Sequence, residues 1–339
     1  MLNDCTYVST REGRLIYAGD YDQRMRVLIT GSSGFIGRSL IQHCATKSSM
    51  DVIATSRTLG ESISGVTWHC VGEIDERTDW SKCVDGIDAV IHLAGRAHVI
   101  RETAPDPEQA FGTVNHLGTR RLAEQAARAG VRRFIFVSTI GVLGNRTMAG
   151  QPLRSSGVPA PHDAYSRSKL AGEHAVREIG ARTAMEVTVV RPPMVIGPGA
   201  PGNFARLVRL VSSGVPIPLG RTPNARSMLA RDNLVDLLLT CLTHPKAAGA
   251  TLLASDGEDL STHELVTEIA AGIGTRARVI RVPDRLLALA CRAAGLRAMH
   301  ARLCGSLRVD ISATTELLGW RPPHSGREAI RKAAHEART

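Results

Sequence analysis

The sequence predicts an α/β protein built on a doubly wound parallel sheet, with a smaller and mostly helical C-terminal part. Three observations support this fold class. Short apolar runs alternate with longer amphipathic ones from Met25 to about residue 191, which is typical of βαβ units. A glycine-rich turn follows the first apolar run. After Arg191 the chain becomes rich in proline and glycine, so irregular loops are expected there.

The elements follow from this alternation in chain order. Apolar stretches of strand length predict strands at residues 26–30, 51–55, 66–70, 88–93, 133–138 and 186–191. Amphipathic stretches predict helices at residues 35–47, 107–129 and 164–179. The later part is expected to contain a helix at 231–243, a strand-like "TLLAS" and then helices with short connections.

Composition limits the classes of function. The chain has 339 residues, 43% of them hydrophobic, and its longest apolar runs fall well short of the roughly 20 residues that span a bilayer. The net charge of +10 comes mainly from arginine, but aromatic residues make up only 4% and no nucleic-acid-reading motif is present. This disfavours nucleic acid as a partner and leaves an anionic small ligand or an acidic membrane surface. The amphipathic stretch at 285–307 is expected to pack within the helical part rather than on a membrane.

The N-terminus and the cysteines bear on location. Residues 1–24 are charged throughout and lack a central apolar stretch, so they do not resemble a secretory signal. We expect folding to begin at Met25, with residues 1–24 either a disordered tail or a start-site artefact. Seven cysteines are dispersed without metal-ligand spacing, which predicts reduced thiols in a cytoplasmic protein and no bound metal. Pairing of Cys70 with Cys83 is the alternative to free, buried thiols.

The stretch "LITGSSGFIGRSL", residues 28–40, places three glycines between a predicted strand and a predicted helix. Gly31 permits a sharp turn, Gly34 lets a pyrophosphate approach the backbone, and Gly37 lets the helix pack closely on the strand. This is the context of a dinucleotide-binding turn, so the sheet is expected to be of the Rossmann type.

Further motifs follow this turn in order. The spacing GxxGxxG, together with "DAVIHLAG", "FIFVSTIGVLG", "YSRSK" and "RPPMVIGPG", resembles the extended short-chain dehydrogenase/reductases, a group of nucleotide-sugar epimerases, dehydratases and reductases. The resemblance runs from Met25 to about Pro323. It implies an NAD(P)-binding domain, which comprises residues 25–191 plus about 226–254. It also implies a nucleotide-sugar-binding domain, which comprises residues about 192–225 plus 255–339.

Tyr165 and Lys169 lie four residues apart in a predicted helix that Asp163 can cap, so their side chains share one helix face. A free tyrosine has a pKa of about 10, and a neighbouring ammonium group favours its ionised form. Lys169 is expected to supply that charge, and the resemblance implies that it also holds the nicotinamide ribose. Either Ser138 or Thr139, at the end of the fifth strand, can reach a substrate oxygen. The resemblance favours Thr139 for this role and puts Ser138 nearer the cofactor.

Cofactor preference depends on the end of the second strand, "DVIATSRTLG", where a carboxylate would bind the adenosine ribose and repel a 2′-phosphate. Ser56 and Arg57 stand there instead, and a hydroxyl with a guanidinium suits a 2′-phosphate, so NADP(H) is favoured over NAD(H). The alternative is a surface arginine beside a permissive pocket. The resemblance implies that Glu73 accepts from the adenine amine and that Ile74 packs on the ring. It assigns further cofactor contacts to Gly31, Gly34, Phe35, Ile36, Gly37, Leu93, Ala94, Gly95, Asn115, Ser138, Tyr165, Lys169, Pro192 and Val195.

The substrate side is assigned mainly from the resemblance. It implies nucleotide contacts at Asn203 and Phe204, in "PGNF", while Ile217 and Leu219 border the base. Arg226 resembles the arginine that binds the diphosphate, and a guanidinium can bind two phosphate oxygens at fixed geometry. Two further arginines are weaker candidates, Arg302 and Arg308.

Several reactions at C4 of a UDP-sugar are consistent with these residues. In a reductase Tyr165 donates a proton as hydride reaches an existing 4-ketone, whereas in an epimerase it first takes the 4-hydroxyl proton. A 4,6-dehydratase needs an acidic pair beside the threonine, but Ile140 and Gly141 follow Thr139. "LASDGEDLST" and "CGSLRVD" also resemble a bacterial subgroup named after UDP-glucose 4-epimerase, some of whose members reduce UDP-4-keto-6-deoxy-N-acetylhexosamines.

We therefore expect an NADP(H)-dependent 4-keto reductase of bacterial surface polysaccharide biosynthesis. Epimerases that retain oxidised cofactor usually carry the carboxylate that Ser56 and Arg57 replace, so a 4-epimerase with tightly bound NAD is the alternative. A nucleotide-sensing protein without catalysis is disfavoured, because such proteins commonly lose the tyrosine or the lysine. The resemblance also implies a homodimer formed through the helices at 107–129 and 164–179.

Overall fold

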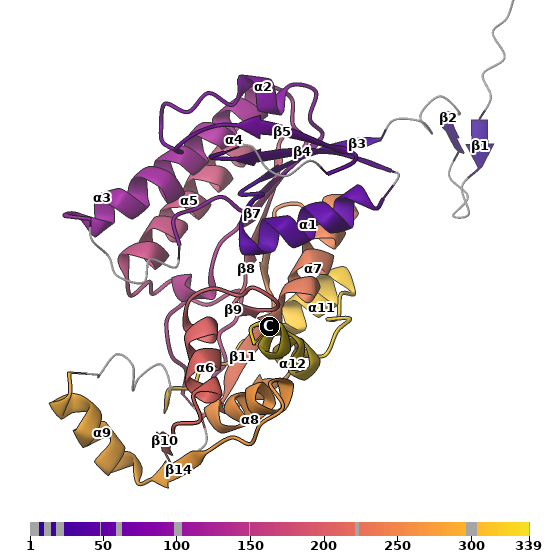
Figure 1. Cartoon of the computed structure of the whole chain (residues 1–339). Helices are drawn as coiled ribbons and strands as arrows, with labels where there is room; N and C mark the ends of the chain where they lie inside the picture. Colours follow the sequence, from indigo (N-terminus) through magenta and orange to yellow (C-terminus); the bar gives the residue numbers. More distant parts are fainter. Residues whose placement is uncertain are drawn as a thin grey trace, which may run out of the picture.

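The computed structural model describes residues 7–9, 15–17, 24–47, 49–58, 63–97, 104–148, 150–220, 224–295 and 304–338. Its main feature is a seven-stranded sheet in which every neighbouring pair of strands is parallel (Figure 1). In spatial order the strands are β12 (Thr251–Leu253), β8 (Glu186–Arg191), β7 (Arg133–Val137), β6 (Ala89–His92), β3 (Met25–Thr30), β4 (Met50–Ser56) and β5 (Val66–Cys70).

This strand order confirms the doubly wound fold. The chain starts at the central β3, runs outward through β4 to β5, returns to β6 on the other side of β3, and continues outward to β12. The direction of winding therefore changes between β3 and β6, and ligands of such sheets bind at the carboxyl ends of the strands on either side of this point. All six predicted strands are present, and their ends differ from the prediction by no more than one residue.

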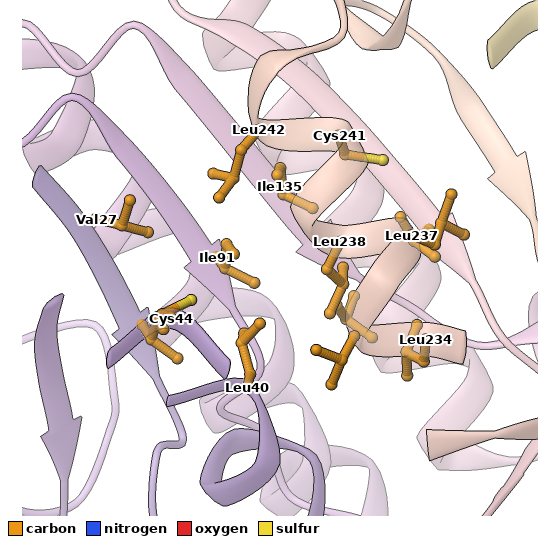
Figure 2. Packing of buried hydrophobic residues seen from close by; sticks show 14 of the residues in the cluster. Val27, Leu40, Cys44, Ile91, Ile135, Leu234, Leu237, Leu238, Cys241 and Leu242 are labelled. Carbon is orange, nitrogen blue, oxygen red and sulfur yellow. The ribbon is translucent and has the colours of Figure 1, made fainter. Parts of the chain in front are cut away.

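One face of the sheet is covered by α1 (Phe35–Ala45) and α7 (Arg231–Thr243). Figure 2 shows Leu40 of α1 and Leu238 of α7 directed toward Ile91 and Ile135 of the strands. Helix α7 is apolar on most of its surface, and Leu234, Leu237 and Leu238 are each fully buried. Burial of each such leucine stabilises the fold by roughly 1.5–3 kcal/mol.

The other face is covered by α4 (Thr119–Arg128) and α5 (Ala164–Ala181), with the short α2 (Ser81–Val84) at one edge. The helix predicted at 107–129 is present and continuous over residues 107–128, but it is not a regular α-helix throughout. It consists of α3 (Pro107–Gly112), a π-helical turn, η2 (Thr113–Gly118), and α4. Such wide turns inside helices frequently occur at functional sites, and this one contains Asn115.

The C-terminal part contains the expected helices and also two small sheets that the sequence reasoning did not predict. Their strands are two to five residues long, too short to show a clear alternation. They are β9 (Met194–Ile196), β11 (Arg226–Ala230) and β13 (Asp259–Leu260) in one sheet, and β10 (Ile217–Gly220) with β14 (Val279–Val282) in the other. The main helices are α6 (Asn203–Ser212), α8 (Thr262–Gly272), α9 (Asp284–Ala293), α11 (Ser312–Leu318) and α12 (Gly326–Glu336).

The N-terminal segment, for which a tail was expected, contains a short antiparallel pair, β1 (Tyr7–Ser9) and β2 (Leu15–Tyr17). The rest of residues 1–23 lies outside the described residues. Within the described ranges every cysteine is a free thiol, Cys70 and Cys83 included. Cys83 is buried as expected, whereas Cys70 is exposed because it lies in the edge strand β5. No helix in the described part of the chain combines the length and apolarity needed to cross a membrane.

Candidate functional site

The glycine turn lies between the carboxyl end of β3 and the N-terminus of α1. Gly31 has a φ of +69°, and a Cβ atom there would lie 2.7 Å from the backbone nitrogen of Ala94. A Cβ on Gly37 would clash with the carbonyl oxygen of Gly31. Gly34 is the N-cap of α1, and no side chain caps that helix end. The first amide groups of α1 are therefore available to an anion, and the closely packed glycine backbone fits the pyrophosphate of a dinucleotide.

Three elements meet beside this turn, at the carboxyl end of β6. A Cβ on Gly95 would lie 2.9 Å from Oδ1 of Asn115 and 3.8 Å from Nζ of Lys169. The Asn115 amide accepts a hydrogen bond from the Arg96 backbone nitrogen (2.8 Å) and donates one to Oγ of Ser168 (2.9 Å). The π-helical turn thus joins the end of β6 to α5, and Gly95 leaves space in front of the lysine.

Helix α5 presents the predicted catalytic pair. The Asp163 carboxylate caps the helix by accepting from the Ser166 backbone nitrogen at 2.7 Å. The Tyr165 side chain lies close to that of Thr139, which follows β7. Burial and the nearby Asp163 raise the pKa of Tyr165 to about 12, and the neighbouring Thr139 hydroxyl opposes this rise. The expected decrease of this pKa is therefore not found in the protein itself, because the half-buried phenol is partly shielded from water.

Lys169 lies one turn after Tyr165 on α5. Its side chain is only 4% exposed, and Nζ lies 4.1 Å from the centre of the Phe136 ring. Burial lowers the pKa of Lys169 to about 7, although the Glu173 carboxylate opposes the shift. Burial therefore favours the neutral form of the lysine and weakens the positive charge that the sequence places beside Tyr165.

Glu173, which the sequence reasoning missed, lies on α5 one turn after Lys169 and is fully buried. Its carboxylate accepts two hydrogen bonds from Arg191, at 2.8 and 2.6 Å, one from Arg177 at 3.0 Å and one from Ser138 at 2.5 Å. These partners hold its pKa below the usual range against the effect of burial. The signal in the sequence was a glutamate on the apolar face of a predicted helix. Because a buried carboxylate needs a partner of opposite charge, such a glutamate predicts a buried cation beside it.

His92, at the end of β6, is 1% exposed and has both ring nitrogens occupied. Nδ1 lies 2.7 Å from the Thr30 hydroxyl and Nε2 lies 2.9 Å from the Thr119 hydroxyl. Burial lowers its pKa to about 3, with a smaller contribution from Lys169. The imidazole is therefore neutral and links β3, β6 and α4.

The adenosine side of the predicted site lies at the carboxyl ends of β4 and β5. The Ser56 hydroxyl donates to the carbonyl of Thr58. Arg57 is exposed and pairs with Glu73 at 3.2 Å. Two residues predicted to contact different parts of the cofactor therefore contact each other. Ile74 packs closely against Gly118 of the π-helical turn.

The remaining predicted cofactor residues lie along the same edge of the sheet. Phe35 begins α1 and has the Arg231 guanidinium 5.5 Å from its ring centre. Ile36 and Leu93 pack against the core formed with α1 and α7. The last two predicted cofactor residues are Pro192 and Val195. Pro192 is buried, and its carbonyl accepts a hydrogen bond from the Ile140 backbone nitrogen at 2.9 Å, whereas Val195 lies in β9.

Comparisons with known proteins agree with this arrangement. The model of the "NAD dependent epimerase/dehydratase family" matches residues 27–252. The chain belongs to this family. The resemblance to the extended short-chain dehydrogenase/reductases is thereby confirmed.

Among the relatives of this chain, a UDP-glucose 4-epimerase of Vibrio cholerae is 39% identical over 93% of this chain and 96% of its own length. A GDP-6-deoxy-D-mannose reductase of Pseudomonas aeruginosa is 27% identical over 90% of this chain and 95% of its own. Among solved structures, UDP-glucuronic acid 4-epimerase from Bacillus cereus in complex with NAD superposes with a TM-score of 0.75, at 21% identity, covering 93% of this chain and 99% of its own. At this identity the structural likeness concerns the fold.

The predicted substrate residues are not gathered in one place. Phe204, Ile217 and Leu219 are 3%, 4% and 5% exposed and belong to the core of the C-terminal part. Asn203 begins α6, but its side chain lies outside the description. Arg226 is half-buried and donates to the Gly305 carbonyl at 2.9 Å. Two predicted arginines remain: Arg308 pairs with Asp259 at 2.6 Å, and Arg302 lies outside the described residues.

Arg226 is the member of this set whose environment suits a phosphate. Burial lowers its pKa, and among the described residues no carboxylate forms an ion pair with it. It begins β11, which lies directly beside β9 in the small sheet. Strand β9 follows β8 and the "RPP" segment in the chain. A partly buried guanidinium without an acidic partner can bind an anionic ligand with little competition from the protein.

Proposed function

We propose that the protein is an NAD(P)-dependent oxidoreductase that acts at C4 of a UDP-sugar. The observation that carries this proposal is the placement of Tyr165 and Lys169 one turn apart on α5, with Thr139 next to the tyrosine and Gly95 in front of the lysine. The 39% identical UDP-glucose 4-epimerase supports the substrate class. Arg226 is proposed to bind the diphosphate of that substrate.

The side chains suggest a division of roles. A bound nicotinamide supplies or accepts a hydride at sugar C4. Tyr165 transfers the proton to or from the oxygen on C4, and Thr139 orients that oxygen through its hydroxyl. Lys169 stabilises negative charge on the tyrosine oxygen when it is ionised. Asn115 holds the backbone at Arg96, next to Gly95, and so maintains the space between β6 and α5.

Our first candidate is reduction of a 4-keto sugar with NADPH. No carboxylate stands at the end of β4, where Ser56 and Arg57 are found. The second candidate is 4-epimerisation with tightly bound NAD, and the Vibrio cholerae relative favours it. The Glu73 carboxylate beside Arg57 also makes that corner less positive than expected from the sequence.

The deciding experiment is a comparison of NADPH and NADH binding to the purified full-length protein. The protein is then denatured, and any released nucleotide is identified by absorbance and mass. Tight NADPH binding with free exchange supports the reductase and directs the search to 4-keto sugars. Retained NAD supports the epimerase. Binding of neither nucleotide, together with no nucleotide released on denaturation, contradicts both candidates.

We further propose a homodimer that buries the outer surfaces of the α3–η2–α4 segment and α5. Leu117, in η2, is a large apolar side chain there and is 38% exposed. We also propose the domain division at residues 25–191 plus about 226–254, and about 192–225 plus 255–339. Light scattering after size-exclusion chromatography tests the dimer, which a monomeric mass at all concentrations would contradict.

A further inference from the structure

The far end of the C-terminal part is both apolar and basic. It is formed by α6, β10, β14 and α9, and Figure 1 shows α9 beside β10 and β14 at the lower left, well away from the seven-stranded sheet. Nine large hydrophobic side chains among the described residues are exposed, and five of them lie in this end. They are Leu210, Val215, Ile280, Leu286 and Leu289. We call residues 203–220 and 275–295 the C-terminal tip.

Helix α9 has two apolar sides. Leu287 is 6% exposed and packs toward the protein, whereas Leu286 and Leu289 are 58% and 64% exposed. Leu286, Leu289, Ala290 and Ala293 follow the spacing of one helix face, so the exposed leucines form a continuous stripe. The segment 285–307 was expected to pack within the helical part. In α9 only the side that carries Leu287 does so, and residues 296–303 of this segment lie outside the described residues.

The charge of the tip is almost entirely positive. Its residues include seven arginines, two in 203–220 and five in 275–295, against a single acidic residue, Asp284. All seven are exposed, and no carboxylate in the described part of the chain forms an ion pair with any of them. Arg285 and Arg292 lie seven residues apart on α9, which puts both on one flank of the leucine stripe.

We propose that the C-terminal tip docks on the surface of an anionic lipid bilayer, with α9 lying in the plane of the interface. An apolar stripe flanked by arginines matches the two layers of such a surface, because leucines enter the acyl boundary while guanidinium groups remain at the phosphates. This distinguishes a bilayer from a second copy of the chain, whose tip would carry the same positive charge and repel it. The inference is independent of which reaction the active site performs.

The test is co-sedimentation of the full-length protein with phosphatidylcholine vesicles that contain phosphatidylglycerol, and with pure phosphatidylcholine vesicles. We expect binding to the anionic vesicles, weaker binding in high salt, and little binding to the neutral ones. Leu289→Glu is expected to weaken binding at least about tenfold, because it removes one inserted side chain. Arg285→Gln is expected to weaken it about fivefold, the contribution of one arginine near such a surface.

Leu317→Glu on α11 is the matched control, since Leu317 is also an exposed helical leucine (37%) but lies outside the tip. It should bind vesicles like the wild type, and unchanged circular dichroism should show that all variants fold. Failure of the wild type to sediment with anionic vesicles overturns the proposal. Equal loss of vesicle binding in Leu289→Glu and Leu317→Glu also overturns it. The same holds if the wild type self-associates without lipid and Leu289→Glu abolishes that self-association. If Arg285→Gln instead weakens UDP binding and leaves vesicle binding unchanged, the arginines serve the nucleotide and the proposal fails.

Discussion

Two arginine–glutamate pairs near the predicted cofactor site differ mainly in their contact with water. Glu173 and Arg191 have side chains that are 0% and 5% exposed, and they share two hydrogen bonds. Arg57 and Glu73 have side chains that are 73% and 80% exposed, and they share one contact at 3.2 Å. The same two residue types therefore have different consequences. The buried pair joins α5 to β8 and to Ser138, whereas the exposed pair contributes little energy and is free to exchange partners with a ligand.

The buried region carries the largest expected effect on activity. In Tyr165→Phe the hydroxyl that transfers the proton is lost, while the ring remains packed against Phe111. We expect turnover to fall by about 10² to 10⁴-fold, the usual contribution of general acid–base catalysis, with cofactor affinity unchanged. Steady-state kinetics and cofactor titration measure the two quantities. Turnover close to that of the wild type would show that Tyr165 is not the proton donor or acceptor.

Glu173→Gln tests the buried pair for stability. The variant keeps the size of the side chain but leaves Arg191 buried without a negative partner, which is expected to cost about 3–5 kcal/mol in the free energy of unfolding. Urea denaturation measures this loss. Glu73→Gln is the matched control in the exposed pair and should change stability by less than about 0.5 kcal/mol. Equal losses in both variants would mean that burial does not separate the two pairs.

Lys169 provides a pH test of the same buried region. Its folded pKa of about 7 lies below the ordinary lysine value of 10.5, so between these values the unfolded chain binds more protons than the native protein. Stability should therefore rise with pH across this window as far as Lys169 is concerned. We would measure the thermal unfolding midpoints of the wild type and of Lys169→Met from neutral to alkaline pH. The difference between the two midpoints isolates the contribution of Lys169. A difference that does not change with pH would contradict the lowered pKa.

Arg57→Gln tests the exposed pair and has the smallest expected effect on the fold. If Arg57 binds a 2′-phosphate, loss of a charge-assisted hydrogen bond should weaken NADPH binding by roughly tenfold to a hundredfold, while NADH binding stays the same. Stability should change by less than about 0.5 kcal/mol. Fluorescence titration with both nucleotides makes the comparison. Equal weakening of both would assign Arg57 a role other than recognition of the phosphate.

Local patterns account for most of the predicted sheet and for the positions of its ends. Gly31, Gly37 and the capping Asp163 act within a few residues of themselves, so their effects can be inferred from spacing alone. The short strands of the C-terminal part depend on pairing with distant partners. Arg226 of β11, for example, pairs with Leu260 of β13, and this cannot be inferred from either segment separately.

The candidate site shows the same division. The spacing of Tyr165 and Lys169 was sufficient to place both side chains on one face of α5, and the spacing of the glycines was sufficient to predict a dinucleotide turn after β3. The inward orientation of Phe204, Ile217 and Leu219 was not accessible in this way. An apolar side chain in a loop-rich region fits a ligand pocket and a protein core equally well in the sequence, and only packing distinguishes them.

The sequence by itself determined the doubly wound sheet, the glycine turn and the pairing of tyrosine and lysine on one helix, because these depend on contacts between near neighbours in the chain. Only the tertiary structure decided the electrostatics of the site. Ser138 and Arg191 reach Glu173 from 35 and 18 residues away, and burial against other elements sets the pKa of Tyr165 and of Lys169. Ionisation depends on how much water and charge surround a group, and in a folded protein those surroundings come from distant parts of the chain.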